Sequence, residues 1–205
     1  MPLRLQVENL GLRYSNKWLF RGISLDIRAG QAWAVTGPNG SGKSSLLALL
    51  AGYKMPSEGK ICYTIHGTPC LSLPSVYGFF WQSPHVQPPP DLRVEDVLSD
   101  VLRWKGALIQ PVPTLVEDLP RKAPLYTLSS GMRHRLMVGL ALSMHKGLVL
   151  LDEPTAFLDH RYKSIVWEAL KAQEAYPERI LLCATNDPAE AALFSQVVSL
   201  AAYAA

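Results

Sequence analysis

The stretch GPNGSGKS, residues 37–44, decides the fold, because it matches the phosphate-binding pattern G-x-x-x-x-G-K-[ST]. Residues 31–36 before it have the composition of a strand. Residues 43–51 after it have that of a helix, which Gly52 is placed to end. Glycines let backbone N–H groups wrap a phosphate, and the positive end of the helix points at it. A strand, this loop and a helix in that order predict a P-loop.

Two side chains of the loop have predicted roles of their own. Lys43 is placed to reach the β- and γ-phosphates of a nucleotide, and the Ser44 hydroxyl is placed to reach Mg²⁺. The loop residues that we expect to contact the nucleotide are Gly37, Pro38, Asn39, Gly40, Ser41, Gly42, Lys43, Ser44 and Ser45.

A P-loop needs an acidic partner strand, and LVLLDEP at residues 148–154 supplies one. Asp152 follows four apolar residues, so we expect it at the end of a buried strand, where it can hold Mg²⁺ through water. Glu153 comes next and suits a general base or a residue that positions water. The segment therefore predicts the metal and hydrolytic side of the same site.

The order of the predicted elements gives an α/β fold. Apolar strands alternate with helices, which implies a mostly parallel sheet covered on both faces. Residues 3–14 and 23–27 are hairpin-like and suggest an antiparallel addition, and the proline-rich stretch 83–128 has the character of an insertion. Further strands are expected at 59–65, 76–82, 147–154, 179–185 and 196–202, with helices at 94–104, 130–145, 160–176 and 188–194.

Composition excludes several classes of protein. The 205 residues carry a net charge of +3, which is too weak and too scattered to indicate nucleic-acid binding. The three cysteines have no CxxC or zinc spacing, which favours buried thiols in a reducing compartment. No signal-peptide pattern opens the sequence, and no apolar run reaches the roughly 18 residues of a membrane span. We therefore expect a soluble, cytosolic chain.

A third motif reveals a family resemblance. The stretch TLSSGMRHRLMVGLAL, residues 127–142, opens a predicted helix shortly before the acidic strand. With the two motifs above, it closely resembles the ATP-binding cassette (ABC) ATPases, whose signature LSGGQ is followed by a basic helix. A serine and a glycine at a helix N-terminus form an anion site. The resemblance implies that Ser129, Ser130 and Gly131 clamp the γ-phosphate of ATP held by the other subunit of a head-to-tail dimer.

The resemblance extends over essentially the whole chain and implies further roles. Tyr14 matches the family's adenine-stacking aromatic, and Gln82 matches the glutamine that reaches the metal and the attacking water. Asp159, in FLD, matches the loop that links the two dimer sites, and Asn186 stands where the family has a switch histidine. Taken alone, Tyr14 could be an inward-packing strand aromatic, Gln82 a surface polar residue and Asp159 a helix N-cap.

By this resemblance the catalytic residues are Glu153, Lys43, Gln82 and Asn186. The metal ligands are Ser44, Gln82 and Asp152, and the cofactors are ATP and Mg²⁺.

The chain departs from the family pattern at three positions, where Ser130, Met132 and Asn186 replace a glycine, a glutamine and the histidine. Ser129 and Gly131 remain, so the clamp should survive. The Cβ of Ser130 matters only if the backbone there needs a positive φ.

Asn186 is the more serious departure, because asparagine can donate and accept hydrogen bonds but cannot carry charge. We also expect Arg133 and Arg135 to form a solvated or partner-facing helix edge.

The resemblance implies a single ABC ATPase domain over residues 1–205. It would have an N-terminal antiparallel β subdomain and a helical subdomain inserted at about 83–145. Such a chain would be the ATP-hydrolysing subunit of a transporter, dimerising with a second cassette, identical or different. Separate transmembrane permease subunits would hold it at the inner face of the cell membrane. Two alternatives stay open, namely an ABC ATPase of assembly or regulation and a slow or silent subunit paired with an active partner.

Overall fold

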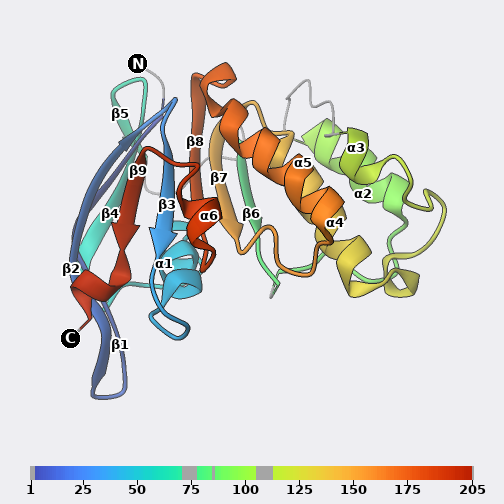
Figure 1. Cartoon of the computed structure of the whole chain (residues 1–205). Coiled ribbons are helices and arrows are strands. Elements are labelled where there is room, and N and C mark those ends of the chain that lie inside the picture. Colours follow the sequence, from blue (N-terminus) through green and yellow to red (C-terminus); the bar gives the residue numbers. More distant parts are fainter. Residues whose placement is uncertain (1–2, 71–77, 85, 105–112, 205) are drawn as a thin grey trace.

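The computed structural model describes residues 3–70, 78–84, 86–104 and 113–204. Two sheets and a set of helices form successive layers, with an antiparallel sheet on one side and a parallel sheet in the middle (Figure 1). The larger helices cover the opposite face of the parallel sheet. This is the α/β arrangement that the sequence predicts. Within the described residues, no helix is long and apolar enough to cross a membrane.

The antiparallel sheet is built from β1 (Arg4–Tyr14), β2 (Lys17–Arg28), β4 (Glu58–Ile65) and β5 (Thr68–Cys70), in the order β2-β1-β4-β5. A tight turn joins β1 to β2, and Tyr14 pairs with Lys17 at the hairpin end. The strand β2 is therefore longer than the predicted 23–27, because pairing with β1 carries it through residues that lack a clear strand pattern. The short strand β5 was not predicted.

The parallel sheet has the order β6-β7-β8-β3-β9, from β6 (Phe79–Gln82), β7 (Lys146–Asp152), β8 (Glu178–Ala184), β3 (Ala32–Thr36) and β9 (Gln196–Ser199). Its two long central strands are apolar without alternation, because helices and the second sheet bury both of their faces. The predicted last strand is shorter than expected, since the chain turns into a 3₁₀ helix after Ser199.

Helices cover both faces of the parallel sheet. The helix α4 ends at Leu142, earlier than the predicted 145, and the predicted helix 160–176 continues beyond Lys171 as a 3₁₀ turn. The α-helices are α1 (Lys43–Leu50), α2 (Val94–Trp104), α3 (Pro113–Val116), α4 (Ser130–Leu142), α5 (His160–Lys171) and α6 (Pro188–Ala191). The 3₁₀ helices are η1 (Leu125–Thr127), η2 (Ala172–Ala175) and η3 (Leu200–Tyr203).

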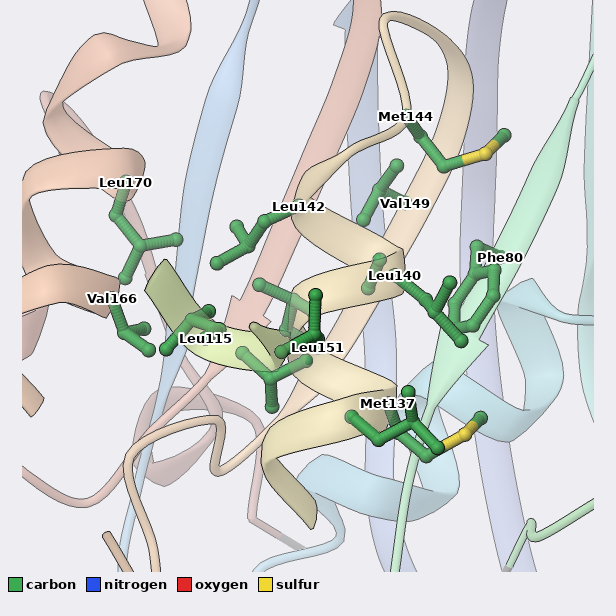
Figure 2. Packing of buried hydrophobic residues seen from close by; sticks show 14 of the residues in the cluster. Phe80, Leu115, Met137, Leu140, Leu142, Met144, Val149, Leu151, Val166 and Leu170 are labelled. Atoms are coloured by element: carbon green, nitrogen blue, oxygen red, sulfur yellow. The ribbon is translucent and has the colours of Figure 1, made fainter. Parts of the chain in front are cut away.

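Alternate residues of β7 divide between two hydrophobic cores. Leu148 and Leu150 lie in the core shared with α1 and the antiparallel sheet. Val149 and Leu151 lie in the core beneath α3, α4 and α5, where Leu140 and Val166 also pack (Figure 2). Burial on both faces fixes the strand in place, so Asp152 at its end and Glu153 directly after it are positioned by packing on either side.

The core position of Val149 leads to a test of this packing. Val149 is fully buried, whereas Val197, on the edge strand β9, is 51% exposed. We expect Val149→Ala to lower the free energy of unfolding by about 2 kcal/mol, because it removes two buried carbon atoms and leaves a small cavity. The matched change Val197→Ala should cost less than about 0.5 kcal/mol. Urea denaturation measures both changes, and equal losses would contradict the assigned layers.

Candidate nucleotide site

The ends of four parallel strands meet at one edge of the sheet. Ala184 pairs with Asp152 on one side and with Val35 on the other, and Gln82 pairs with Leu151. Because these strands are in level register, the loops that follow them leave the sheet side by side. In open α/β sheets ligands bind at this carboxyl edge. The chain places the P-loop, the two acids, Gln82 and Asn186 there.

The P-loop depends on glycine at the start of α1. Gly42 adopts a left-handed conformation with φ of 98° as the N-cap of this helix, and no side chain caps the helix. A Cβ atom at Gly42 would lie 2.6 Å from the Leu19 Cδ2 atom, so the loop also needs glycine for close packing against β2. The first N–H groups of α1 therefore stay available to a phosphate.

Lys43 is buried, and its ammonium group is held inside the loop. Its Nζ atom donates to the carbonyl oxygens of Gly37 at 3.0 Å and Pro38 at 3.3 Å. It also donates to the Oδ1 atom of Asn186 at 2.5 Å. The cation thus connects the P-loop to the residue that follows β8.

Asn186 forms the centre of a side-chain network. While its Oδ1 atom accepts from Lys43, its Nδ2 atom donates to Glu153 Oε1 at 2.7 Å and to Asn39 Oδ1 at 2.5 Å. The amide therefore contacts a cation through its acceptor and an acid through its donor. The sequence predicted that these residues share a site, but it did not predict the side-chain contact of Asn39, for which the loop pattern has no signal.

Asp152 is fixed by contacts on three sides. Its Oδ1 atom accepts from Ser44 Oγ at 3.0 Å, and its Oδ2 atom accepts from Ser83 Oγ at 3.3 Å. Its backbone N–H donates to Gln82 Oε1 at 3.1 Å. Gln82 is only 1% exposed, so it is not a surface polar residue. Ser83 was not predicted, and its one signal is its place directly after Gln82.

The donor set suits Mg²⁺ better than a transition metal. The hydroxyl of Ser44 and a carboxylate oxygen of Asp152 lie within hydrogen-bonding distance of each other, and Mg²⁺ prefers oxygen ligands of this kind. Among the described residues, no three His, Cys, Asp or Glu side chains gather into a metal cluster.

Tyr14 lies at the rim of the P-loop pocket, whose lining is Tyr14, Leu19, Asn39, Gly40, Gly42, Lys43, Ser44, Ser45 and Glu153. Its side chain is half exposed, so it does not pack inward. Lys54 donates a hydrogen bond to its phenol oxygen, and the Lys54 Nζ atom lies 5.0 Å from the ring centroid. Hydrogen bonds from Lys54, and secondarily from Ser45, lower the pKa of the Tyr14 phenol.

Two of the three signature residues, Ser129 and Gly131, line a second pocket that shares no lining residue with the P-loop pocket. Ser129 is the N-cap of α4, where its Oγ atom accepts from the Met132 N–H at 3.2 Å. Ser130 is in the first turn of the helix without a positive φ, so its Cβ brings no backbone strain. The lining of this signature pocket is Ser129, Gly131, Met132, Arg135, Phe157, Leu158, Asp159 and Tyr162.

Asp159 borders the signature pocket and also caps a helix. Its Oδ1 atom accepts from the Tyr162 N–H at 3.0 Å at the start of α5. Two residues earlier, Phe157 is 73% exposed. A Cβ on Gly131 would lie 3.3 Å from the Phe157 carbonyl oxygen, so glycine permits this loop to approach α4 closely.

We expected Arg133 and Arg135 to form a solvated or partner-facing helix edge, and solvation is wrong for Arg135, while Arg133 is half-buried. Arg135 is 6% exposed, its Nη2 atom donates to Asp118 Oδ1 at 2.8 Å, and its guanidinium carbon lies 4.0 Å from the Tyr162 ring centroid. Arg133 donates to the Leu128 carbonyl at 2.7 Å. Both arginines therefore fasten α4 to its neighbours.

The comparison with protein families agrees with this geometry. The sequence model of a family described as ABC transporter matches residues 20–156. The chain belongs to the ABC transporter family.

The chain is also similar to two curated ABC relatives. It is 33% identical to the Nod factor export ATP-binding protein I of Ralstonia nicotianae, over 87% of this chain and 58% of that protein. It is 29% identical to the cytochrome c biogenesis ATP-binding export protein CcmA of Brucella abortus, over 91% of this chain and 86% of that protein.

A dimeric ATP-binding cassette in a post-hydrolysis state, bound to ADP and Pi, superimposes with a TM-score of 0.76. It has 18% identity and covers 95% of this chain and 93% of its own, which shows the shared fold. The chain spans 58% to 63% of the length of the Nod factor export relatives.

The packing of Gly42 leads to a prediction for nucleotide affinity. Gly42→Ala should weaken ATP binding by about tenfold or more, because the new methyl group would press on Leu19 and distort the loop. Gly52→Ala is a matched control, since Gly52 also has a positive φ, next to the other end of α1, but has no atom within 4 Å of its ideal Cβ. Titration with a fluorescent ATP analogue measures both, and equal affinities of the two variants would contradict this reading of the loop.

Proposed function

We propose that the chain is the ATP-binding and ATP-hydrolysing subunit of an ABC transporter. The observation that carries this proposal is the hydrogen-bonded network at the sheet edge, in which Asn186 joins Lys43 to Glu153 beside the Ser44 and Asp152 pair. Family membership and the names of the relatives support the same function.

In this proposal the P-loop pocket binds ATP with its phosphates at the glycine-rich loop and its adenine at the pocket rim. The amides of the glycine-rich loop and the N-terminus of α1 bind the phosphates, and Lys43 neutralises the β- and γ-phosphates. Tyr14, at the pocket rim, stacks on the adenine. Ser44, Asp152 and Gln82 would hold Mg²⁺, which supplies positive charge to the transferring phosphoryl group.

Hydrolysis would rest on Glu153 and Asn186. Glu153 orients the attacking water and accepts its proton, which is the role of a general base. In this structure the Nδ2 atom of Asn186 donates to the Glu153 carboxylate. When ATP is bound, the same Nδ2 atom would donate to the γ-phosphate instead. An amide supplies this contact without charge, and losing a charge-assisted contact in the transition state costs about 2–4 kcal/mol, or roughly 10²–10³ in rate. We therefore propose a slow ATPase.

A second cassette, identical or different, completes the site. The signature pocket and the P-loop pocket have no lining residue in common, which supports a site that two chains complete together. In a head-to-tail dimer, Ser129, Ser130 and Gly131 of the partner subunit would face the γ-phosphate. Asp159 lies at the junction of the signature pocket and α5, where it can link the two sites.

An apolar pocket beside Gln82 is the proposed contact for a membrane-embedded permease subunit. Its lining is Tyr53, Phe79, Phe80, Trp81, Val86 and Met137. Tyr53 and Trp81 meet edge-on in it, with ring centroids 5.0 Å apart, and Tyr53 is 66% exposed. An apolar pocket with an exposed aromatic side chain at its edge supports an interaction surface here. Docking there would place the chain peripherally on the inner face of the membrane.

An ABC ATPase of assembly or regulation is the alternative, and the genes beside this one distinguish the two. A neighbouring reading frame with several apolar spans favours transport, whereas soluble neighbours favour the alternative.

The network at Asn186 gives the test of slow hydrolysis. We expect the purified wild-type protein to hydrolyse Mg·ATP well below one turnover per second and Asn186→His to raise kcat by about tenfold or more, because histidine can carry charge to the γ-phosphate. Steady-state phosphate release measures both. Lys43→Ala is the control for contaminating ATPase. A wild-type rate of several per second, or no gain with histidine, would contradict the proposal.

A further inference from the structure

Glu190 is a buried carboxyl group that the site described above does not use. It lies on the short helix α6 and is 1% exposed. Burial is the main reason that its pKa is raised, and the charge of Asp187 raises the pKa further. Neither carboxyl oxygen has a partner at full hydrogen-bonding geometry among the described residues. A carboxyl group that is buried without a hydrogen bond of standard geometry indicates a specific structural or functional role.

The groups that face Glu190 come from three separate elements. Side-chain donors on Thr185, Thr155 and Trp167 all lower its pKa, although none completes a hydrogen bond of standard geometry. The Trp167 indole N–H likewise lacks an acceptor in the described chain. The side chains of Thr185, Thr155 and Trp167 therefore lie near enough to the Glu190 carboxyl group to interact with it.

The positions of two of these donors connect Glu190 to the hydrolytic side chains. Thr155 lies two residues after Glu153, and Thr185 directly precedes Asn186. The backbone N–H of Glu153 donates to the Ala184 carbonyl at 2.8 Å, so the two segments already meet at the sheet edge. Glu190 thus interacts with Thr155 on one segment and Thr185 on the other, and Asn186 and Glu153 of the same two segments are hydrogen-bonded to each other.

An ion pair fixes the third element. Lys163 of α5 donates to the Asp187 carboxylate at 2.5 Å, and its Nζ atom lies 4.8 Å from the Trp167 ring centroid. This pair holds α5, and Trp167 with it, against the segment that leads into α6. Burial raises the pKa of the Cys183 thiol on β8, and the charge of Glu190 raises that pKa further.

We propose that Glu190 is a positioning residue that holds the loop carrying Glu153 against the segment carrying Asn186, through Thr155, Thr185 and Trp167. The effect on catalysis rests on the proposed ATPase function, whereas the effect on the two loops does not. Glu190 is not among the residues that line the P-loop pocket, so its loss should change how fast bound ATP is hydrolysed and leave ATP binding intact.

Amide hydrogen exchange in the nucleotide-free protein tests the positioning role without reference to ATP. Glu190→Leu should raise exchange rates at residues 153–158 and 184–187 together, by about tenfold, and leave the centre of α4 unchanged. Glu168→Leu is the matched control on the exposed face of α5 and should leave both loops unchanged. Unchanged exchange at the two loops in Glu190→Leu would overturn the proposal, whatever the ATPase activity.

Steady-state kinetics tests the catalytic consequence. Glu190→Leu should lower kcat by about tenfold and leave KM for ATP within about twofold, while Glu190→Gln, which keeps the shape and one acceptor, should restore most of kcat. An unchanged kcat in Glu190→Leu, or a rise in KM that accounts for the loss, would overturn the proposal. If the wild-type protein hydrolyses no ATP, the proposed function fails and hydrogen exchange still decides this inference.

A gentler variant covers the case in which Glu190→Leu does not fold. Thr155→Val keeps the side-chain volume and removes one donor facing the carboxyl group, so it should give the same pattern with a smaller effect, about threefold in kcat. Wild-type exchange and kcat in Thr155→Val would count against the proposal.

Discussion

The level register of β7, β8 and β3 is the constraint on which the rest of the site depends. Ala184 pairs with Asp152 and Val35 at once, so three strands end together at one edge. This brings Ser44 to Asp152 across 108 positions of sequence. Burial of both faces of β7 holds the register, because a slip by one residue would exchange the side chains facing its two cores. The packing of the sheet therefore determines how accurately the site residues are positioned.

An uncharged amide, Asn186, at the centre of this site distinguishes the chain from the family pattern, which has a histidine there. Asn186 uses its acceptor on Lys43 and its donor on Glu153, so one neutral side chain satisfies a cation and an acid together. A charged histidine in the same place would favour the acid and oppose the cation. Asparagine in place of histidine at position 186 therefore keeps the network hydrogen-bonded, and we propose that it slows ATP hydrolysis.

Much of the fold follows from local sequence, because strand, P-loop and helix are neighbours in the chain and each carries its own signal. The apolar run of β7 predicts a buried strand and the site of Asp152. The features that escaped prediction depend on partners far away in sequence. From sequence alone Arg135 is typical of a solvated helix edge, and its burial depends on contacts with Asp118 and Tyr162, which are distant in sequence. Ser83 and Glu190 have no pattern of their own, since only tertiary packing brings their neighbours to them.

The most direct test of the account is a double-mutant cycle between Ser44 and Asp152, with ATP affinity measured in Mg²⁺ and in excess chelator. If strand register places both residues on one metal ion, Ser44→Ala and Asp152→Asn should be coupled by about 1 kcal/mol or more in Mg²⁺, a factor of about fivefold in Kd. The coupling should vanish in chelator. Additive losses in Mg²⁺ would contradict the claim that the aligned strand ends build one shared site.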